Sequence, residues 1–272
     1  MALGWAPRRH RRTTLDVSLR ILAHAQTDVG RKRKKNEDSY LVSEELGLFV
    51  VADGMGGHAG GEVASAEACD QVFTMVKRGA AAFAQLRARD SEETRAAARR
   101  VVESAIQAAT YMIFGIADQD PDRKGMGTTL SCLVWIGPIA IVGQVGDSRV
   151  YLIRDDVAVQ ITEDHTLINM QLKSGAITPE QAKTATYGNV ITRAVGINDY
   201  VEVDTFAFDT RAGDRLMLCS DGVHGYLDSD EQLMALCRGR GREDCAHTLV
   251  QHALVSGGKD NATVLIVDVL DA

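Results

Sequence analysis

Three apolar segments of this chain end in the same way, with an aspartate followed by a small residue, and this recurrence limits the possible folds most strongly. The segment Leu48 to Ala52 is one example, and its unbroken apolar character is typical of a strand covered on both faces. Two further acidic pairs stand immediately before apolar segments. The five acidic sites are Glu37-Asp38, Asp53-Gly54, Asp147-Ser148, Asp221-Gly222 and Asp260-Asn261. Because strand ends gather at the rim of a sheet, we expect these acids to converge.

Converging carboxylates need a compensating charge. Two carboxylates about 4 Å apart repel by about 4 kcal/mol at an effective dielectric of 20, so the group must spread apart, take up protons or bind cations. The candidate ligands are all oxygens, which favours Mg²⁺ or Mn²⁺ over zinc or copper. Gly54 lets its backbone carbonyl approach an ion closely. Each Asp-Gly pair taken singly also fits an ordinary turn, and the complete set favours a metal centre.

Composition and charge exclude several classes of protein. The chain has 30 Lys and Arg against 37 Asp and Glu, a net charge of −7, which argues against a nucleic-acid partner or an anionic membrane. No stretch reaches the ~18 apolar residues of a membrane helix, and Trp135 to Val145 fits a hairpin instead. The five cysteines form no CxxC pair and fit reduced, buried thiols. We therefore expect a cytoplasmic protein with no membrane insertion and no secretory signal.

The apolar periodicity predicts separate groups of strands and helices. Apolar residues recur at three- and four-residue spacing from Glu92 to Ala117, which predicts a long helix after a first helix at Glu62 to Lys77. Four short strands joined by Gly, Asp or Pro turns predict an antiparallel meander: Thr128–Trp135, Ile139–Val145, Arg149–Ile153 and Val157–Ile161. The remaining expected elements are strands Val201–Phe208, Arg215–Ser220 and Ala262–Val269, and helices Asp230–Cys237 and Arg242–Val255. This order indicates an α+β fold.

A basic cluster lies beside the first acidic pair, between residues 27 and 38. An arginine fork binds a phosphate through two hydrogen bonds and stays charged at any working pH. We assign Arg33 to binding a substrate phosphate. The alternative is that Arg31 to Lys35 is a solvated turn or a localisation-like run, and we accept it for the lysines of this cluster.

Together these stretches resemble the PP2C-type (PPM, metal-dependent) protein serine/threonine phosphatases in their bacterial form. The matching motifs occur in the family's order and span residues 27 to 261. They are Thr27-Asp28-x-Gly30-x-x-Arg33-x-x-Asn36-Glu37-Asp38, Asp53-Gly54-Met55-Gly56-Gly57-His58, Gly127-Thr128-Thr129, Gly146-Asp147-Ser148-Arg149, Asp164-His165, Asn189 to Gly196, Ser220-Asp221-Gly222 and Gly258-x-Asp260-Asn261. The resemblance carries weight because it rests on many motifs in the family's order and not on a single one.

The resemblance implies a four-layer α-β-β-α sandwich of two antiparallel sheets flanked by helices, with a dinuclear Mn²⁺ or Mg²⁺ centre at one end. By position, Asp53 would bridge both ions. Asp221 and Asp260 would complete the ligands of one ion, and Glu37 with the Gly54 carbonyl would hold the other.

Further roles follow from the same resemblance. Asp38 would orient the attacking water at the metal site, and Asp147 would share a third, weaker ion with Asp221. The animal enzymes have Asp-Gly-His where this chain has Asp53-Gly54-Met55, which leaves the general acid open. His58 is one candidate, and a loop histidine that hydrogen-bonds locally is the alternative.

The chain divides into a flexible basic tail at residues 1–14, which could be a frayed terminus or a binding arm, and a single phosphatase domain at residues 15–272 with a flap at about 165–196. The resemblance implies hydrolysis of phosphoserine and phosphothreonine by direct attack of water. The expected partners are phosphorylated proteins, including a serine/threonine protein kinase, and the expected state is a monomer. A catalytically inactive phosphoprotein-binding regulator and a phosphatase specific for an anti-sigma antagonist are the alternatives.

Overall fold

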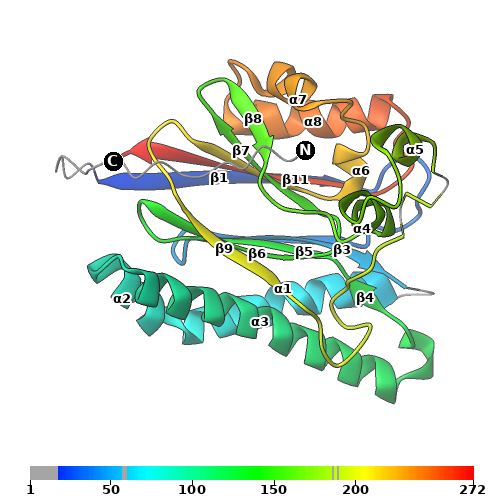
Figure 1. The fold of residues 1–272 in the computed structure, drawn as a ribbon, viewed down its shortest axis with the longest axis horizontal. Helices are drawn as coiled ribbons and strands as arrows, with labels where there is room; N and C mark the ends of the chain where they lie inside the picture. Colours follow the sequence, from blue (N-terminus) through cyan, green and yellow to red (C-terminus); the bar gives the residue numbers. More distant parts are fainter. Residues whose placement is uncertain (1–17, 57–59, 186, 189) are drawn as a thin grey trace.

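Two antiparallel β-sheets stack face to face in the computed structural model, which describes residues 18–56, 60–185, 187–188 and 190–272 (Figure 1). The first sheet has the order β1 (Leu19–Asp28), β11 (Ala262–Asp271), β10 (Arg215–Cys219), β7 (Arg149–Arg154) and β8 (Val157–Gln160). The second has the order β2 (Asp38–Ser43), β3 (Leu48–Met55), β5 (Leu130–Trp135), β6 (Ile139–Val145) and β9 (Asp204–Asp209), with the short β4 (Gly127–Thr128) paired to β3.

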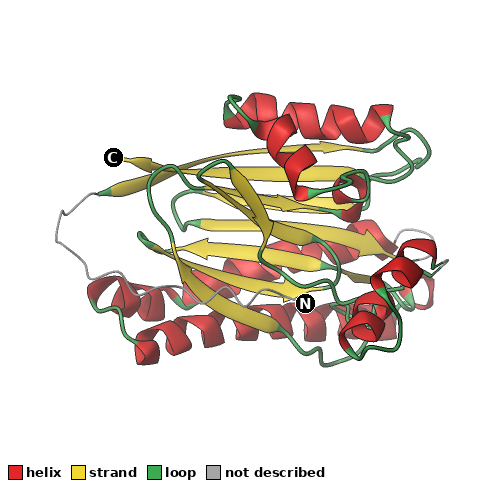
Figure 2. Cartoon of the chain, turned by 45° about the horizontal axis from the view of Figure 1, so that its top comes forward, coloured by secondary structure: helices red, strands yellow, loops and turns green. Residues whose placement is uncertain are grey.

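Helices cover the outer faces of both sheets (Figure 2). The second sheet is covered by α1 (Gly60–Arg78), α2 (Ala80–Ala88) and α3 (Glu92–Gln119), and the first by α7 (Asp230–Cys237) and α8 (Arg242–Val255). Three short helices, α4 (Leu167–Lys173), α5 (Pro179–Thr184) and α6 (Asp221–His224), gather at one end of the sandwich (Figure 1). A 3₁₀ turn, η1 (Pro121–Arg123), follows α3. Within the described ranges, none of the helices is both long and apolar enough to cross a membrane.

Strand β3 is buried on both faces because its side chains alternate between two apolar layers. Leu48, Val50 and Ala52 pack toward the helices of the second sheet, whereas Phe49 and Val51 pack between the two sheets. All five side chains are fully buried. The unbroken apolar run that predicted a doubly covered strand is thereby confirmed.

The same alternation in β11 builds the third apolar layer. Leu265 and Val267 face the space between the sheets, and Val264 and Ile266 face α8. The protein therefore has one apolar layer between the sheets and one under each helical face, which confirms the predicted four-layer sandwich.

The predicted meander is wrong in one respect, because its four strands divide between the two sheets. Strands β5 and β6 pair in the second sheet, and β7 and β8 pair in the first. The chain crosses between the sheets at Gly146, whose φ is +95° and whose added Cβ would lie 2.7 Å from the Thr129 side chain. Only glycine fits this turn without strain. The crossing places Asp147 between the two sheets rather than on an outer hairpin.

Candidate metal centre

The five acidic sites converge at one end of the sandwich, where several strands begin or end (Figure 1). Asp38 opens β2 and is the cross-strand partner of Asp53 near the end of β3. Asp221 directly follows β10 as the first residue of α6, and Asp260 lies just before β11. Asp147 lies at the crossing between β6 and β7. Segments from both sheets therefore bring together acids that are up to 223 residues apart, since Glu37 precedes Asp260 by that number.

Asp38 is a buried carboxylate with one satisfied and one free oxygen. Its Oδ2 accepts hydrogen bonds from Ser220 Oγ at 2.8 Å and Thr263 Oγ1 at 2.6 Å. Its Oδ1 is buried and has no partner. Burial raises the pKa of Asp38 to about 6, although the two hydroxyl donors act against the shift.

Asp53 and Asp221 are acids whose pKa values both rise in this cluster. Burial and the charges of Asp38 and Asp221 raise the pKa of Asp53 well above its ordinary value. Burial and the neighbouring Asp260 raise the pKa of Asp221, although Asp53 acts to lower it. Oδ1 of Asp221 is buried without a partner.

Glu37 and Gly54 are held together by close backbone contact. The Gly54 N–H donates to the Glu37 carbonyl at 3.1 Å, and a Cβ on Gly54 would lie 2.1 Å from the carbonyl oxygen of Gly61. No other residue fits here, because the clash is with backbone. The Glu37 N–H donates to Asn261 Oδ1 at 2.8 Å, and burial raises the pKa of the Glu37 carboxyl.

Arg33 reaches the acidic cluster from the loop that follows β1. Its Nη2 donates to Asp260 Oδ2 at 2.7 Å, and its side chain is half exposed. Asn261 ties this loop to the start of β11, because its Nδ2 donates to the carbonyls of Val29 and Lys35 at 2.9 Å. The guanidinium therefore lies beside the acids and remains accessible to a ligand.

Asp147 is buried at the edge of the same cluster. Burial, followed by the charge of Asp221, raises the pKa of Asp147 to about 7. Its carbonyl accepts a hydrogen bond from His224 Nε2 at 2.9 Å, which links the crossing between the sheets to α6. Asp147 is thus held close to Asp221 by the backbone.

The residues present fit hard divalent cations. Asp38 and Asp221 each present a buried oxygen without a partner, the Gly54 backbone packs closely against Glu37, and the surrounding donors are oxygens. Among the described residues, no three acidic, histidine or cysteine side chains already surround one point at ligand distance. Arg33 holds Oδ2 of Asp260 by a hydrogen bond. His58 and the basic tail lie outside the described residues.

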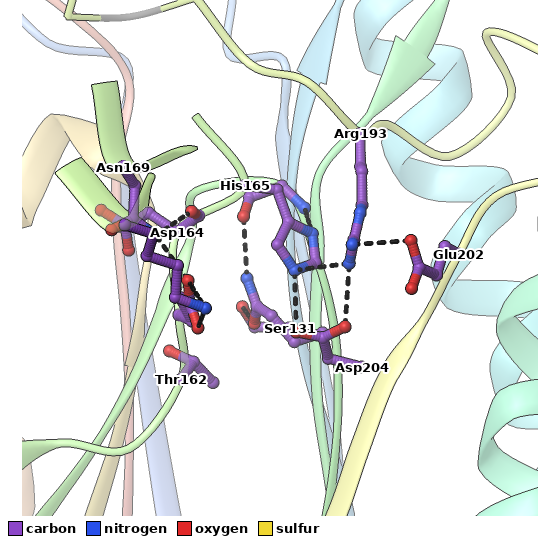
Figure 3. A network of polar contacts seen from close by, with 12 residues as sticks. Ser131, Thr162, Asp164, His165, Asn169, Arg193, Glu202 and Asp204 are labelled. Carbon is purple, nitrogen blue, oxygen red and sulfur yellow. Dashed lines mark hydrogen bonds and ion pairs between the residues drawn. The ribbon is translucent and has the colours of Figure 1, made fainter. Parts of the chain in front are cut away.

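A polar network around His165 and Arg193 was not assigned a role from the sequence (Figure 3). The Gly146 N–H donates to His165 Nδ1 at 3.2 Å, so Nε2 carries the hydrogen and donates to Asp204 Oδ2 at 3.1 Å. Arg193 donates to Asp204 at 2.8 Å and pairs with Glu202 at 2.7 Å. Burial acts to raise the pKa of Asp204, but the bonds from His165 and Arg193 lower it overall. The network joins both ends of the segment 165–196 to the crossing that carries Asp147.

Arg149 and Asp164 extend this network toward the first sheet. Arg149 Nη2 donates to Asp164 Oδ2 at 2.7 Å, and its Nε donates to both oxygens of the same carboxylate. The adjacent Asp164-His165 pair was visible in the sequence as a motif. The structural role of this pair could not be read there, because its partners come from the crossing at Gly146, from β7, β8 and β9, and from Arg193.

Comparison with known proteins decides the family. Residues 27–243 match the family model for protein phosphatase 2C, and this range contains every acidic site except Asp260. The chain belongs to the protein phosphatase 2C family. The resemblance inferred from the sequence motifs is therefore confirmed.

Bacterial phosphatases are among the relatives of this chain. The chain is 37% identical over 255 residues to the serine/threonine protein phosphatase PstP of Mycobacterium tuberculosis (strain ATCC 25618 / H37Rv), covering 94% of this chain and 46% of that protein. It is 36% identical over 249 residues to the serine/threonine phosphatase stp of Listeria innocua serovar 6a, covering 90% of this chain and 95% of that protein. The chain thus spans about half the length of the mycobacterial relative and nearly all of the listerial one.

A solved structure of the family shows the same architecture. The crystal structure of the catalytic domain of the serine threonine protein phosphatase PstP in complex with two manganese ions has a TM-score of 0.77 and 34% sequence identity to this chain. The match covers 93% of this chain and 100% of that domain. The fold seen here is therefore that of a protein phosphatase 2C catalytic domain.

Proposed function

We propose that this chain is a metal-dependent protein serine/threonine phosphatase that hydrolyses phosphoserine and phosphothreonine. The observation that carries the proposal is the convergence of Asp38, Asp53 and Asp221, whose pKa values are all raised and two of which present unpartnered buried oxygens. Such a cluster favours cation binding over a purely structural role, because buried like charges destabilise a fold.

The acidic residues divide between two proposed ion sites. Asp53 lies centrally and would bridge two Mn²⁺ or Mg²⁺ ions, with Asp221 and Asp260 completing one site. Glu37 and the Gly54 carbonyl would hold the other ion. The two manganese ions bound by the PstP catalytic domain support a centre of two ions. Asp147, buried beside Asp221, would contribute to a third and weaker site.

Bound divalent cations lower the pKa of a coordinated water toward neutrality and offset negative charge on a phosphoryl group. Asp38, held by Ser220 and Thr263, would orient the attacking water through its free Oδ1. Arg33 would leave Asp260 and bind two phosphoryl oxygens. His58 stays a candidate for protonating the leaving serine or threonine oxygen.

The substrates we propose are phosphorylated proteins, with an autophosphorylated serine/threonine kinase as the expected partner. The names of the mycobacterial and listerial relatives support a serine/threonine phosphatase activity. Residues 15–272 would form one catalytic domain that acts as a monomer in the cytoplasm. The alternative of a catalytically inactive regulator predicts that a metal-binding residue is missing from the sequence. Every acid that the resemblance assigns to the metals is present.

The experiment that tests the proposal measures phosphate release from a phosphothreonine peptide. We expect turnover with added Mn²⁺ or Mg²⁺ and loss of at least 100-fold in EDTA, because removing the ions removes water activation. A phosphotyrosine peptide of the same sequence is the matched substrate control. Absence of turnover by folded, metal-saturated protein would support the inactive regulator.

A further inference from the structure

Cys237 and Cys245 form a close pair of thiols outside the proposed metal centre. Their Sγ atoms are 2.7 Å apart, and both cysteines are free and buried. Cys237 is the last residue of α7, and Cys245 lies in the first turn of α8. A disulfide bond is about 2.05 Å long, so only a small shift would join the two sulfurs.

Arg215 gives this pair the electrostatic environment of a reactive thiol. Its guanidinium lies beside the pair and is held by Asp268, to which Nε donates at 2.6 Å and Nη2 at 3.0 Å. The bond from Cys237 lowers the pKa of Cys245, and Arg215 lowers it further, whereas the bond to Cys245 raises the pKa of Cys237. Cys245 is therefore the thiol of the pair that ionises more easily. The N-terminus of α8 also favours a thiolate in its first turn.

A cavity of about 280 Å³ reaches Cys237, the partner of Cys245. Cys237 and Arg215 line it together with Met234, Arg238 and Asp268. The cavity is large enough for a molecule with two oxygen atoms, because a water molecule occupies about 30 Å³ of liquid volume. Both thiols are therefore buried from bulk solvent, and a small oxidant in the cavity would lie beside Cys237, whose sulfur touches that of Cys245.

The other three cysteines lack these features. Burial raises the pKa of Cys69, Cys132 and Cys219 to about 12, which keeps each of them a protonated thiol. Thiolates, rather than thiols, attack oxidants. The lowered pKa of Cys245 therefore distinguishes the Cys237 and Cys245 pair from the other three cysteines.

We propose that Cys237 and Cys245 are a redox modification site, which a peroxide converts to a disulfide that joins α7 to α8. One thiolate of the pair attacks a peroxide oxygen, the O–O bond breaks, and a sulfenic acid forms as water leaves. The second thiol then attacks that sulfur, the S–O bond breaks, and a second water leaves with the thiol proton. The two thiols lose two electrons and two protons, and hydrogen peroxide is reduced to two waters. A small dithiol reverses the reaction by exchange.

The test uses the complete chain, reduced and then freed of reductant. After brief treatment with hydrogen peroxide, catalase is added, the protein is denatured, and remaining thiols are alkylated. We expect three of the five thiols to be alkylated and peptide mapping to find the Cys237–Cys245 disulfide. A reducing agent should restore five alkylated thiols.

Variants separate the pair from the other cysteines. Cys245→Ser should abolish the disulfide, whereas Cys69→Ala should leave it unchanged. Arg215→Gln should slow disulfide formation several-fold at pH 7, and the difference should shrink at pH 10, where thiols ionise without assistance. Five alkylated thiols in peroxide-treated wild-type protein, or a disulfide between other cysteines, would overturn the proposal.

Discussion

Asp38 shows how single residues set the chemistry of the proposed centre. Its Oδ2 is held by hydroxyls from two different segments, Ser220 and Thr263, while its Oδ1 is left without a partner. A buried carboxylate that is only half satisfied is costly in a protein interior. The arrangement therefore favours a function in which the second oxygen gains a ligand.

The sequence predicted the acids of this site better than the residues that hydrogen-bond to them. Asp53 and Asp221 were recognisable because each ends an apolar run. The hydroxyls of Ser220 and Thr263 were not, because isolated serines and threonines carry no signal of their distant partners. The pairing of Arg33 with Asp260 was also not predicted, although both residues were assigned to the site.

Arg33→Ala tests the assignment of the phosphate-binding residue. We expect KM for a phosphopeptide to rise about tenfold or more with a smaller change in kcat, because charge-assisted hydrogen bonds contribute about 1.5–3 kcal/mol. The free energy of unfolding should change by less than about 1 kcal/mol, since the Arg33 side chain is half exposed. Lys32→Ala, an exposed change in the same loop, is the control. An unchanged KM for Arg33→Ala would place the phosphate site elsewhere.

At the scale of elements, helix α3 depends on its N-terminal cap. The Ser91 side chain accepts from the Thr94 N–H, and Thr94 Oγ1 accepts from the Ser91 N–H in return. Ser91→Ala should lower the free energy of unfolding by about 1 kcal/mol, measured by chemical denaturation, and leave phosphatase activity unchanged. Ser104→Ala, an exposed change in the same helix, should have no such cost. Equal stabilities of the two variants would contradict a role for the cap.

Elements with strong periodicity were predicted closely, whereas their assignment to sheets was not. Helices Asp230–Cys237 and Arg242–Val255 and strand Ile139–Val145 have the predicted bounds. The alanine-rich α2 (Ala80–Ala88) was missed because its apolar pattern is short and weak. The crossing at Gly146 was missed because one glycine turn can either continue a hairpin or change sheets, and only long-range packing decides between these outcomes.

At the scale of the whole molecule, the sandwich holds acids together that would otherwise repel. Packing in three apolar layers fixes the strand ends and brings Asp38, Asp53, Asp147 and Asp221 to one place. The stability of the fold and the binding of cations are therefore coupled, because any ligand that binds only the folded state stabilises it.

This coupling predicts how stabilisation by the metal depends on pH. Burial raises the pKa of Asp38 to about 6 and that of Asp147 to about 7, above the ordinary value of about 3.9. In this window the metal-free folded protein binds more protons than the unfolded chain, so its stability falls as pH rises. Cations displace these protons, so metal affinity should fall about tenfold per pH unit below the pKa for each proton displaced.

The measurement compares melting temperatures of manganese-loaded and dialysed metal-free protein. We expect the difference between the two forms to grow from pH 5 to pH 7.5. Burial lowers the pKa of His224 to about 3, but this effect contributes to both forms and cancels in the difference. A difference that stays constant over this pH range would contradict the coupling.

The central claim is that the converging carboxylates bind the ions that the reaction needs, and Asp53→Asn tests it most directly. Mn²⁺ binding by calorimetry and phosphate release from a phosphothreonine peptide should be measured on the same protein. We expect the variant to melt cooperatively, to bind at least tenfold more weakly and to lose at least 1,000-fold in turnover, because the bridging charge is gone. Asp118→Asn, an exposed change on α3, should match the wild-type protein. Wild-type binding and turnover in Asp53→Asn would contradict the account.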